Sequence, residues 1–345
     1  MRVLIKKKTF QSGEIIPSLI ADGPYLVTWD TAARRLVDIA LDVPVRINLD
    51  GAAMIEDVTM TVFTKSLETD FLSDFYEYRH VEIFDSSGYL LFYGNITEST
   101  YDESKGTVKL VCRSNFSRYM TAPFTYSNLS QNPVEAVKSM IEAVGGAVDQ
   151  DSYTRVYDLL EADTVRAAFS FNLADQIGTF DAVERTCGLF GFYIFQEAGV
   201  FYFWAPDTYR NDIPLSENDI GNIKYEFQAA KYTQLSVTWE LGTNVEVLTK
   251  NSELYGLIDH AVDLSRPANI VAFEVGTITH GVKRMFDFRS ARRRFIEFIS
   301  EKNLDLRERY TLQRETASIQ FQIVEKTLTP AGIYSYRALL TGASW

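Results

Sequence analysis

Cysteine, histidine and positive charge are all scarce in this sequence. Its 345 residues include 2 cysteines and 3 histidines, which excludes a disulfide-rich scaffold and favours a chain made in a reducing compartment. The two thiols, Cys112 and Cys187, fall in apolar segments and are predicted to be buried and inert. Lysine and arginine number 34 against 46 aspartate and glutamate residues, for a formal net charge of −12. This balance argues against nucleic-acid binding through a broad basic surface.

Long hydrophobic runs are also lacking. The most apolar stretch, residues 189–204, is interrupted by Gln196 and Glu197 and is shorter than the ~20 residues that a membrane span requires. At the start of the chain, the lysines of residues 1–8 follow the apolar residues instead of preceding them, and no apolar segment of a signal peptide comes next. We therefore expect neither a signal peptide nor a membrane span.

Sequence patterns for catalysis and metal binding are missing as well. His80, His260 and His280 stand apart from one another and from cysteine, in none of the spacings that hold zinc. Asp259 beside His260 is the nearest approach to an acid–base pair, but no nucleophile motif accompanies it. Glycine-rich phosphate-loop patterns do not occur. We predict no catalytic, cofactor-binding or metal-binding residues, no cofactor and no enzymatic activity.

Aromatic residues, by contrast, are abundant, with 23 Phe and 19 Tyr. Their rings pack well on a pleated, half-buried surface and favour strands. Short segments with alternating apolar residues, divided by Gly, Asp and Ser turns, fill the first 120 residues. These segments are 43–49, 58–62, 80–84, 89–93 and 107–112. The pattern predicts an antiparallel barrel or sandwich.

The periodicity changes between about residues 124 and 206. Asn132 followed by Pro133 predicts the N-cap and first residue of a helix that a glycine pair ends. A second helix is predicted from Thr179 and also ends at glycine. The hairpin that follows, residues 192–204, is apolar on both faces of its strands, so both faces should be covered. This region is predicted to be a small α/β insert with two helices and a hairpin.

Strands return after the insert, at 234–239, 270–275, 318–324 and 333–340. A third helix is predicted over about 282–302, because Met285, Phe288, Phe295 and Ile299 would share one face. The chain is therefore predicted to be mainly β, with an α/β insert between two antiparallel β-barrels. The predicted domains are 1–123 for the first barrel, 124–206 for the insert and 207–345 for the second barrel, which carries the helix near 282–302.

The strongest basic cluster is the run Arg292, Arg293 and Arg294. On a helix, these three side chains would fan over about 200° and could not form one stripe. We predict that the run is a solvated or subunit-facing patch, with Glu297 and Glu301 placed for pairing along the helix.

One segment of the sequence carries a residue pattern that points to a particular protein family. The strand 79–84, the segment Phe92-Tyr93-Gly94-Asn95-Ile96 and the strand 108–113 follow one another across glycine and polar turns. This resembles the strand–turn–"lF.G.I"–strand–"v.l.C.d" pattern in the first barrel of bacteriophage baseplate-hub and related tail proteins. Residues 180–203 look like a second element of that family, a helix ending in glycine and then a hairpin. The sequence departs from the family's pattern in two places. The hairpin turn has Glu197-Ala198-Gly199 where the family usually has Asp-Gly, and the first 40 residues have no clear counterpart in the family.

The resemblance implies a virion structural protein, the hub of a phage-type tail. Two tail-tube-like barrels per subunit would form, in a homotrimer, a six-fold-like ring that adapts the hexameric tail tube to a three-fold spike or tip. The tail tube or a distal tail protein would bind one side, and the spike or tip protein the other. The protein would be made in the bacterial host cytoplasm and located in the virion, at the tail tip or baseplate.

In such a ring, DNA would pass through the pore without specific binding. Three subunits at −12 each carry −36, and an acidic wall repels phosphate, whereas each basic contact adds affinity by counterion release. We therefore expect more Asp and Glu than Lys and Arg on the pore wall. The arginines 292–294 are expected to turn outward or into a subunit contact.

Two other functions stay open. A distal-tail or receptor-binding protein would expose aromatic side chains in a groove, where they stack on carbohydrate. A tail-associated cell-wall hydrolase would bring two carboxylates to about 5–10 Å across a cleft, which sequence alone does not reveal.

Overall fold

The computed structural model describes most of the chain. The described residues are 2–6, 25–30, 41–49, 57–63, 80–85, 87–102, 104–105, 107–114, 126–161, 167–171, 178–239, 244–263, 285–314, 318–328 and 333–341. The predicted strand 270–275 and His280 lie outside these residues.

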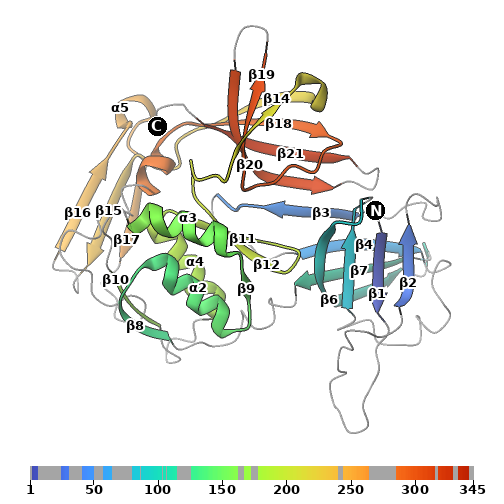
Figure 1. The fold of residues 1–345 in the computed structure, drawn as a ribbon. Helices are drawn as coiled ribbons and strands as arrows, with labels where there is room; N and C mark the ends of the chain where they lie inside the picture. The colour runs from blue at the N-terminus through green and yellow to red at the C-terminus, as the bar shows by residue number, and fades with distance from the viewer. Residues whose placement is uncertain are drawn as a thin grey trace.

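A 13-stranded sheet dominates the fold (Figure 1). Its N-terminal strands are β1 (Arg2–Lys6), β2 (Tyr25–Asp30), β3 (Leu41–Arg46), β4 (Asp57–Phe63), β5 (His80–Phe84), β6 (Leu90–Asp102) and β7 (Thr107–Ser114). Its C-terminal strands are β13 (Asp212–Leu215), β14 (Gly221–Gln228), β18 (Arg293–Ser300), β19 (Arg309–Gln313), β20 (Ser318–Leu328) and β21 (Tyr334–Leu340). The main strand order is β14-β18-β21-β20-β3-β4-β7-β6-β5-β1-β2, and β19 pairs with β20 and β13.

The pairing of β3 with β20 joins the two sets of strands. It is antiparallel, with Arg46 opposite Glu325 and Val45 opposite Lys326. In Figure 1 the C-terminal strands, in yellow, orange and red, lie above β3, and the other N-terminal strands, in blue and teal, lie beside and below it. Strands from residues 2–114 and from residues 212–340 therefore share one sheet, and the β3–β20 seam is where the two sets meet.

Alternation of side chains explains the sheet. In β4, Val58 and Met60 are buried while Asp57 and Thr59 are exposed. The same period of two places residues from β3 to β7 and from β18 to β21 in one core cluster. The prediction of a mainly β fold is confirmed. Along the described strands the order runs open from β14 to β2, without a closed barrel.

The insert contains a helical layer against a hairpin. Its elements are β8 (Tyr126–Gln131), α2 (Pro133–Ala143), β9 (Ala147–Val148), α3 (Gln150–Glu161), β10 (Ala167–Phe171), α4 (Thr179–Phe190), β11 (Tyr193–Glu197) and β12 (Val200–Trp204). Asn132 caps α2 as predicted, since its side chain accepts from the Val134 amide at 2.8 Å. α4 ends at Gly191, whose φ of 70° is the left-handed conformation that suits glycine. The α/β insert is confirmed.

Helix α3 is an element that the sequence analysis missed. Asp149 precedes it and accepts from the Ser152 amide at 2.8 Å, and Val156 and Leu160 are buried four residues apart. A carboxylate cap and an i, i+4 apolar pair were therefore the signals that could have revealed it.

A separate three-stranded sheet comes after the insert in the chain. It consists of β15 (Gln234–Trp239), β16 (Asn244–Thr249) and β17 (Asp259–Asp263), with the short helix α5 (Ser252–Tyr255) between β16 and β17. A 3-10 turn, η5 (Glu217–Asp219), separates β13 from β14. In the described part of the chain, no helix has both the length and the apolar character to cross a bilayer.

The helix predicted over about 282–302 is wrong in its second half. Residues 285–290 are helical, but β18 begins at Arg293. Along β18, Arg293, Phe295 and Phe298 are buried, whereas Arg294 is exposed. Pairing with β14 on one side and β21 on the other satisfies the backbone of β18. These long-range hydrogen bonds outweigh the helix-like spacing of its apolar residues.

Candidate assembly surface

The histidines and cysteines of the described chain lie apart. Cys112 and Cys187 are fully buried, as predicted, and this burial raises the pKa of both thiols. His80 is buried, with Nε2 at 3.2 Å from Glu82. His260 stacks on Tyr232 at 4.8 Å, and desolvation there, together with the charges of Arg289 and Lys231, lowers its pKa. Over the described residues, no three His, Cys, Asp or Glu side chains gather to hold a metal ion.

We expect no activity of the chain on peptidoglycan. Replacing His260 by alanine should change the free energy of unfolding by no more than about 0.5 kcal/mol, because the residue lies at the surface. Replacing Cys187 by serine should lower it by about 1–3 kcal/mol, because a hydroxyl is then buried in an apolar site. The turbidity of a cell-wall suspension measures lytic activity, and urea denaturation measures the free energy of unfolding of each variant. Reproducible wall lysis that one carboxylate substitution abolishes would contradict this expectation.

A buried group of polar side chains lies at the β3–β20 seam. Lys326 Nζ donates to Glu197 Oε1 and to Asn303 Oδ1, the latter at 3.2 Å. The side chains of Lys326 and Glu197 are only 4% and 2% exposed. Lys326 belongs to β20 and Glu197 ends the first strand of the hairpin, so this group, the polar junction, ties the insert to the seam. An unpaired buried charge is costly, and each partner therefore needs the other.

A second ion cluster lies beside the polar junction. Arg307 Nε donates to both carboxylate oxygens of Asp305, at 2.8 and 2.9 Å, and its guanidinium stacks on Tyr202 of the hairpin at 4.6 Å. Burial opposes ionisation of Asp305, but the bonds from Arg307 and the nearby charge of Lys326 prevail and lower its pKa. Arg307 also approaches Asp149 of the insert at 3.8 Å. The insert is thus held to the C-terminal strands by charge as well as by apolar contact.

The N-terminal strands are held to the C-terminal strands through Asp85. This buried carboxylate accepts from the Ser87 and Tyr89 amides, both at 2.8 Å, and from the hydroxyl of Tyr334 in β21 at 3.1 Å. Burial alone would raise the pKa of Asp85, but the hydrogen bond from the Ser87 hydroxyl, at 2.6 Å, and the bonds from Tyr89, Tyr334 and the Ser87 amide lower it. The three parts of the chain therefore meet around one polar region, which restricts their rotation relative to one another.

Along the main strand order of the sheet, one of the two outer strands is β14, and the other is β2. Among the described strands β14 pairs only with β18. Tyr225 and Phe227 are 46% and 54% exposed on it, and the Arg292 guanidinium lies over the Phe227 ring at 4.6 Å. An edge strand with open backbone groups and large exposed rings is a site where another chain adds readily. We define this β14 edge as the candidate assembly surface.

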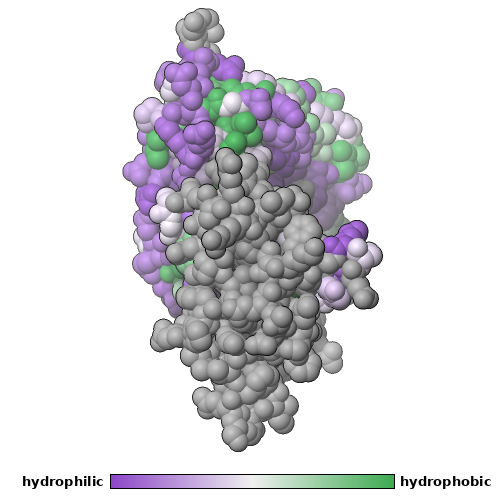
Figure 2. Space-filling view, turned by 90° about the vertical axis from the view of Figure 1, so that its right-hand side faces the viewer, coloured by the Kyte–Doolittle hydropathy of each residue, from purple (hydrophilic) through white to green (hydrophobic). Residues whose placement is uncertain are grey.

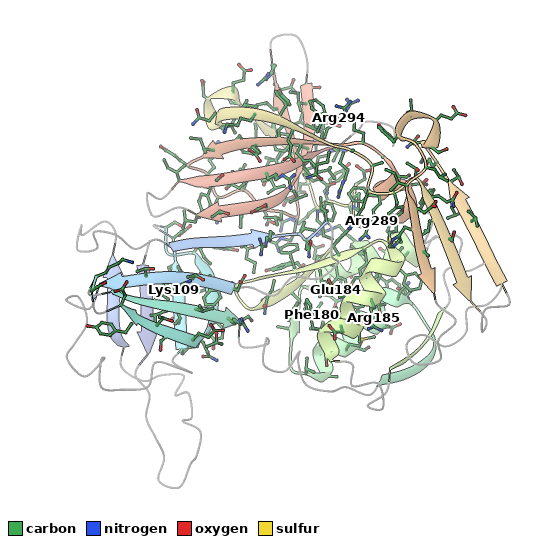
Figure 3. All side chains as sticks on the ribbon, turned by 180° about the vertical axis from the view of Figure 1, so that it is seen from behind. Lys109, Phe180, Glu184, Arg185, Arg289 and Arg294 are labelled. Atoms are coloured by element: carbon green, nitrogen blue, oxygen red, sulfur yellow. The ribbon has the colours of Figure 1, made fainter. Side chains whose placement is uncertain are left out.

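The three consecutive arginines divide between the two faces of β18. Arg292 and Arg294 are exposed, and Figure 3 shows Arg294 beside the C-terminal strands. Arg293 is buried, 5.8 Å from the ring of Phe288. The exposure of Arg292 and Arg294 is compatible with the predicted solvated or subunit-facing patch, whereas the prediction is wrong for Arg293, because successive residues of a strand face opposite sides. The helical pairing expected for Glu297 is wrong for the same reason.

Among the residues whose exposure the structure describes, the exposed aromatic side chains are Tyr89, Tyr101, Tyr225 and Phe227. Tyr225 and Phe227 share the edge strand β14, Tyr101 lies on β6, and Tyr89 lies in the turn before β6. Figure 2 shows one face of the molecule, on which the described apolar residues form small patches among polar ones. A cavity at the β3–β20 seam is lined by neither Tyr nor Trp and by a single carboxylate, that of Glu325. These observations favour neither carbohydrate binding nor glycoside hydrolysis.

No protein-family model matches the sequence, and no curated protein matches it. Solved structures do match its fold. A tail protein from Neisseria meningitidis MC58 aligns with a TM-score of 0.58 and 10% identity, over 88% of this chain and 92% of that one. The 43 kDa tail protein of prophage MuSo2 from Shewanella oneidensis aligns with a TM-score of 0.56 and 10% identity, over 98% and 97%.

A third match comes from a secretion system. The E. coli c3393 protein, a type VI secretion system component described as structurally similar to the T4 bacteriophage tail proteins gp27 and gp5, aligns with a TM-score of 0.50 and 7% identity. The alignment covers 90% of this chain and 75% of that one. At these identities the comparisons establish the fold, and the fold is that of phage tail proteins.

Proposed function

We propose that this chain, with its phage tail protein fold, is a structural component of a phage-type tail and acts there as the hub. In this role it forms a homotrimeric ring that adapts the hexameric tail tube to a three-fold spike or tip. The observation that carries the proposal is the tail-protein fold combined with an open edge strand, β14, which displays Tyr225 and Phe227. An assembly role is what such an edge suits.

The internal geometry supports an adaptor. Each chain contributes two sets of strands, one N-terminal and one C-terminal. A ring of three chains therefore contains six such sets. We propose that these sets, which share one open sheet in the single chain, act as the two units of the ring, within 1–123 and 207–345, with the insert at 124–206 between them. A ring with both three-fold and six-fold character requires a defined angle between its units. Glu197, Lys326 and Asp85 supply that constraint, because they bond across the three parts.

The proposed partners follow from this position. The tail tube or a distal tail protein binds one side of the ring, the spike or tip protein binds the other, and the ring is located in the virion. The pore lets DNA pass without specific binding, which the net charge of −12 per chain favours. In a trimeric structure, we expect acidic side chains to outnumber basic ones on the pore wall.

Light scattering on the purified chain at micromolar concentration is expected to give about three times the subunit mass of 39.2 kDa. Replacing Phe227 by lysine should weaken assembly about thirtyfold, because it removes an exposed ring and adds a charge beside Arg292. Tyr101 is similarly exposed but lies on β6, so Tyr101→Lys is the matched control and should leave assembly unchanged. A mass near 39.2 kDa at every concentration, the same for all three proteins, would contradict the self-assembling ring.

A further inference from the structure

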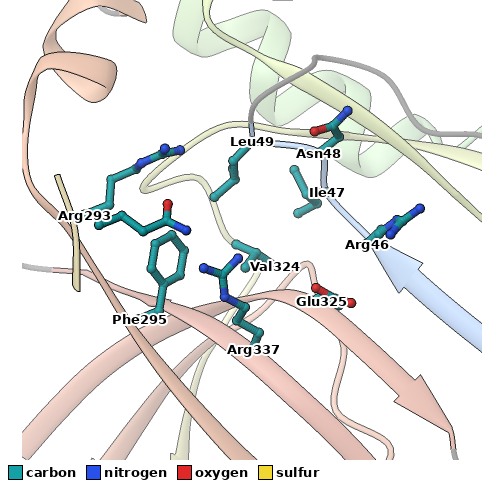
Figure 4. A pocket seen from close by; sticks show the side chains of 10 residues that line it. Arg46, Ile47, Asn48, Leu49, Arg293, Phe295, Val324, Glu325 and Arg337 are labelled. Carbon is teal, nitrogen blue, oxygen red and sulfur yellow. The ribbon is translucent and has the colours of Figure 1, made fainter. Parts of the chain in front are cut away.

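The seam between the two sets of strands borders a cavity of about 300 Å³ that is open to solvent on one side (Figure 4). Its walls come from the end of β3 and the residues after it, and from β14, β18, β20 and β21. The lining residues are Arg46, Ile47, Asn48, Leu49, Gln228, Arg293, Phe295, Val324, Glu325 and Arg337. This volume is at the lower limit of ligand pockets, roughly 300–1,000 Å³, and suits one or two side chains better than a cofactor.

Positive charge prevails in the cavity although the chain as a whole is acidic. Arg46, Arg293 and Arg337 line it from three different strands, against the carboxylate of Glu325 in the wall and that of Glu226, which pairs with Arg337. Figure 4 shows the Arg337 guanidinium rising between Phe295 and Val324, with Arg293 and Arg46 to either side. A low-dielectric pocket with an excess of guanidinium groups attracts an anion.

Arg337 is already held in position for such a ligand. Its guanidinium stacks on the ring of Phe295 at 4.1 Å, and its Nε and Nη2 donate to one oxygen of Glu226, at 3.1 and 2.8 Å. A guanidinium has five N–H donors, so this contact uses only part of its capacity. The planar fork of an arginine fixed in this way matches a carboxylate and loses little entropy on binding it.

The rest of the wall combines two polar side chains, those of Asn48 and Gln228, with four apolar ones. Ile47, Leu49, Phe295 and Val324 are all at least nine-tenths buried in the chain and border the same space. A strongly hydrated anion alone would leave this surface without a partner. A carboxylate beside an apolar side chain would satisfy both halves of the cavity. A nucleic-acid strand is disfavoured, because each added phosphate meets the net charge of −12.

We propose that this seam cavity is a binding site for an acidic side chain and its apolar neighbour, presented by a peptide segment of a partner protein. The carboxylate pairs with Arg337 and Arg46, and the apolar neighbour packs on Ile47, Leu49 and Val324. The proposal goes beyond ring formation, because it assigns a docking site at the seam and not at the β14 edge.

Isothermal titration of the full chain with a capped Leu-Glu-Leu peptide tests the site. The peptide is expected to bind, and its Leu-Gln-Leu analogue and inorganic phosphate should each bind about tenfold more weakly or not at all, since a charge-assisted bond and the apolar contacts are both needed. Arg46→Gln, at an exposed position, and Arg337→Gln should each weaken peptide binding about tenfold. Arg113→Gln, also exposed but remote in β7, should not. Thermal denaturation verifies that each variant is folded.

Four results would overturn the proposal. Equal binding of the glutamine peptide would show an apolar groove with no role for the arginines. Phosphate binding as strong as peptide binding and equally sensitive to Arg46→Gln would show a general anion site. Loss of self-association in Arg46→Gln would show that a second copy of this chain occupies the cavity. Absence of peptide binding to a folded chain would show that the cavity is not a peptide site.

Discussion

Replacing Lys326 by methionine is expected to lower the free energy of unfolding by about 3–5 kcal/mol, because the change leaves the carboxylate of Glu197 buried without its cation. Methionine preserves the length of the side chain, so the effect reports the charge and not a cavity. Urea denaturation followed by intrinsic fluorescence measures it. Because Lys326 holds the insert to the seam, we also expect the variant to lose ring assembly.

Two further variants separate this effect from a general loss of lysine. Lys105 and Asp102 form an exposed pair whose side chains are 74% and 38% accessible, so Lys105→Met should cost less than about 1 kcal/mol. The double variant Lys326→Met with Glu197→Leu should recover most of the stability, since replacing both members of a buried pair by apolar groups is often nearly neutral. If Lys326→Met is no more destabilising than Lys105→Met, the polar junction does not hold the parts together.

Replacing Gly94 by alanine is expected to lower the free energy of unfolding by about 3 kcal/mol or more. A Cβ at this position would lie 2.3 Å from the carbonyl oxygen of Arg113 and 2.8 Å from its carbonyl carbon, in the backbone of the neighbouring strand β7. Backbone cannot move aside as a flexible side chain can, so the strands must separate or the register must change. Thermal and urea denaturation measure the loss of stability. In hydrogen exchange, the amides of β6 and β7 should be the first to lose protection.

Gly221 provides the matched control. It also lies in a strand, β14, but a Cβ there would meet Ile299 Cγ1 at an ordinary 3.5 Å. Gly221→Ala should therefore be neutral or should stabilise the chain by up to about 1 kcal/mol, because alanine reduces the freedom of the unfolded chain. Equal effects of the two substitutions would show that the close approach at Gly94 does not matter.

Gly94 also explains why one part of the sequence was informative about the fold. It is the glycine of the Phe92-Tyr93-Gly94-Asn95-Ile96 segment, on which the resemblance to tail proteins rested. Phe92 and Ile96 are fully buried, and the glycine between them lets β6 lie against β7. The motif thus records a packing requirement between β6 and β7.

The candidate assembly surface and the polar junction were less accessible to sequence analysis. Tyr225 and Phe227 look like any other strand aromatics, and only the strand order shows that β14 is an outer strand. Glu197 did carry a signal, since it is a charged residue within an otherwise apolar hairpin. Its partner Lys326 lies 129 residues away, and no pattern in the sequence connects the two.

Local signals determined the features that the sequence alone predicted: the alternating strands, the capped helix after Asn132, the helix that ends in glycine before the hairpin, and the burial of Cys112 and Cys187. Each depends on residues within a few positions of one another, where chain geometry dictates which side chains share a face. The tertiary structure alone decided that β18 is a strand, that β3 pairs with β20, and that Lys326 meets Glu197. Those outcomes depend on hydrogen bonds and charges between distant segments, whose energies exceed local preferences but leave no periodic trace along the chain.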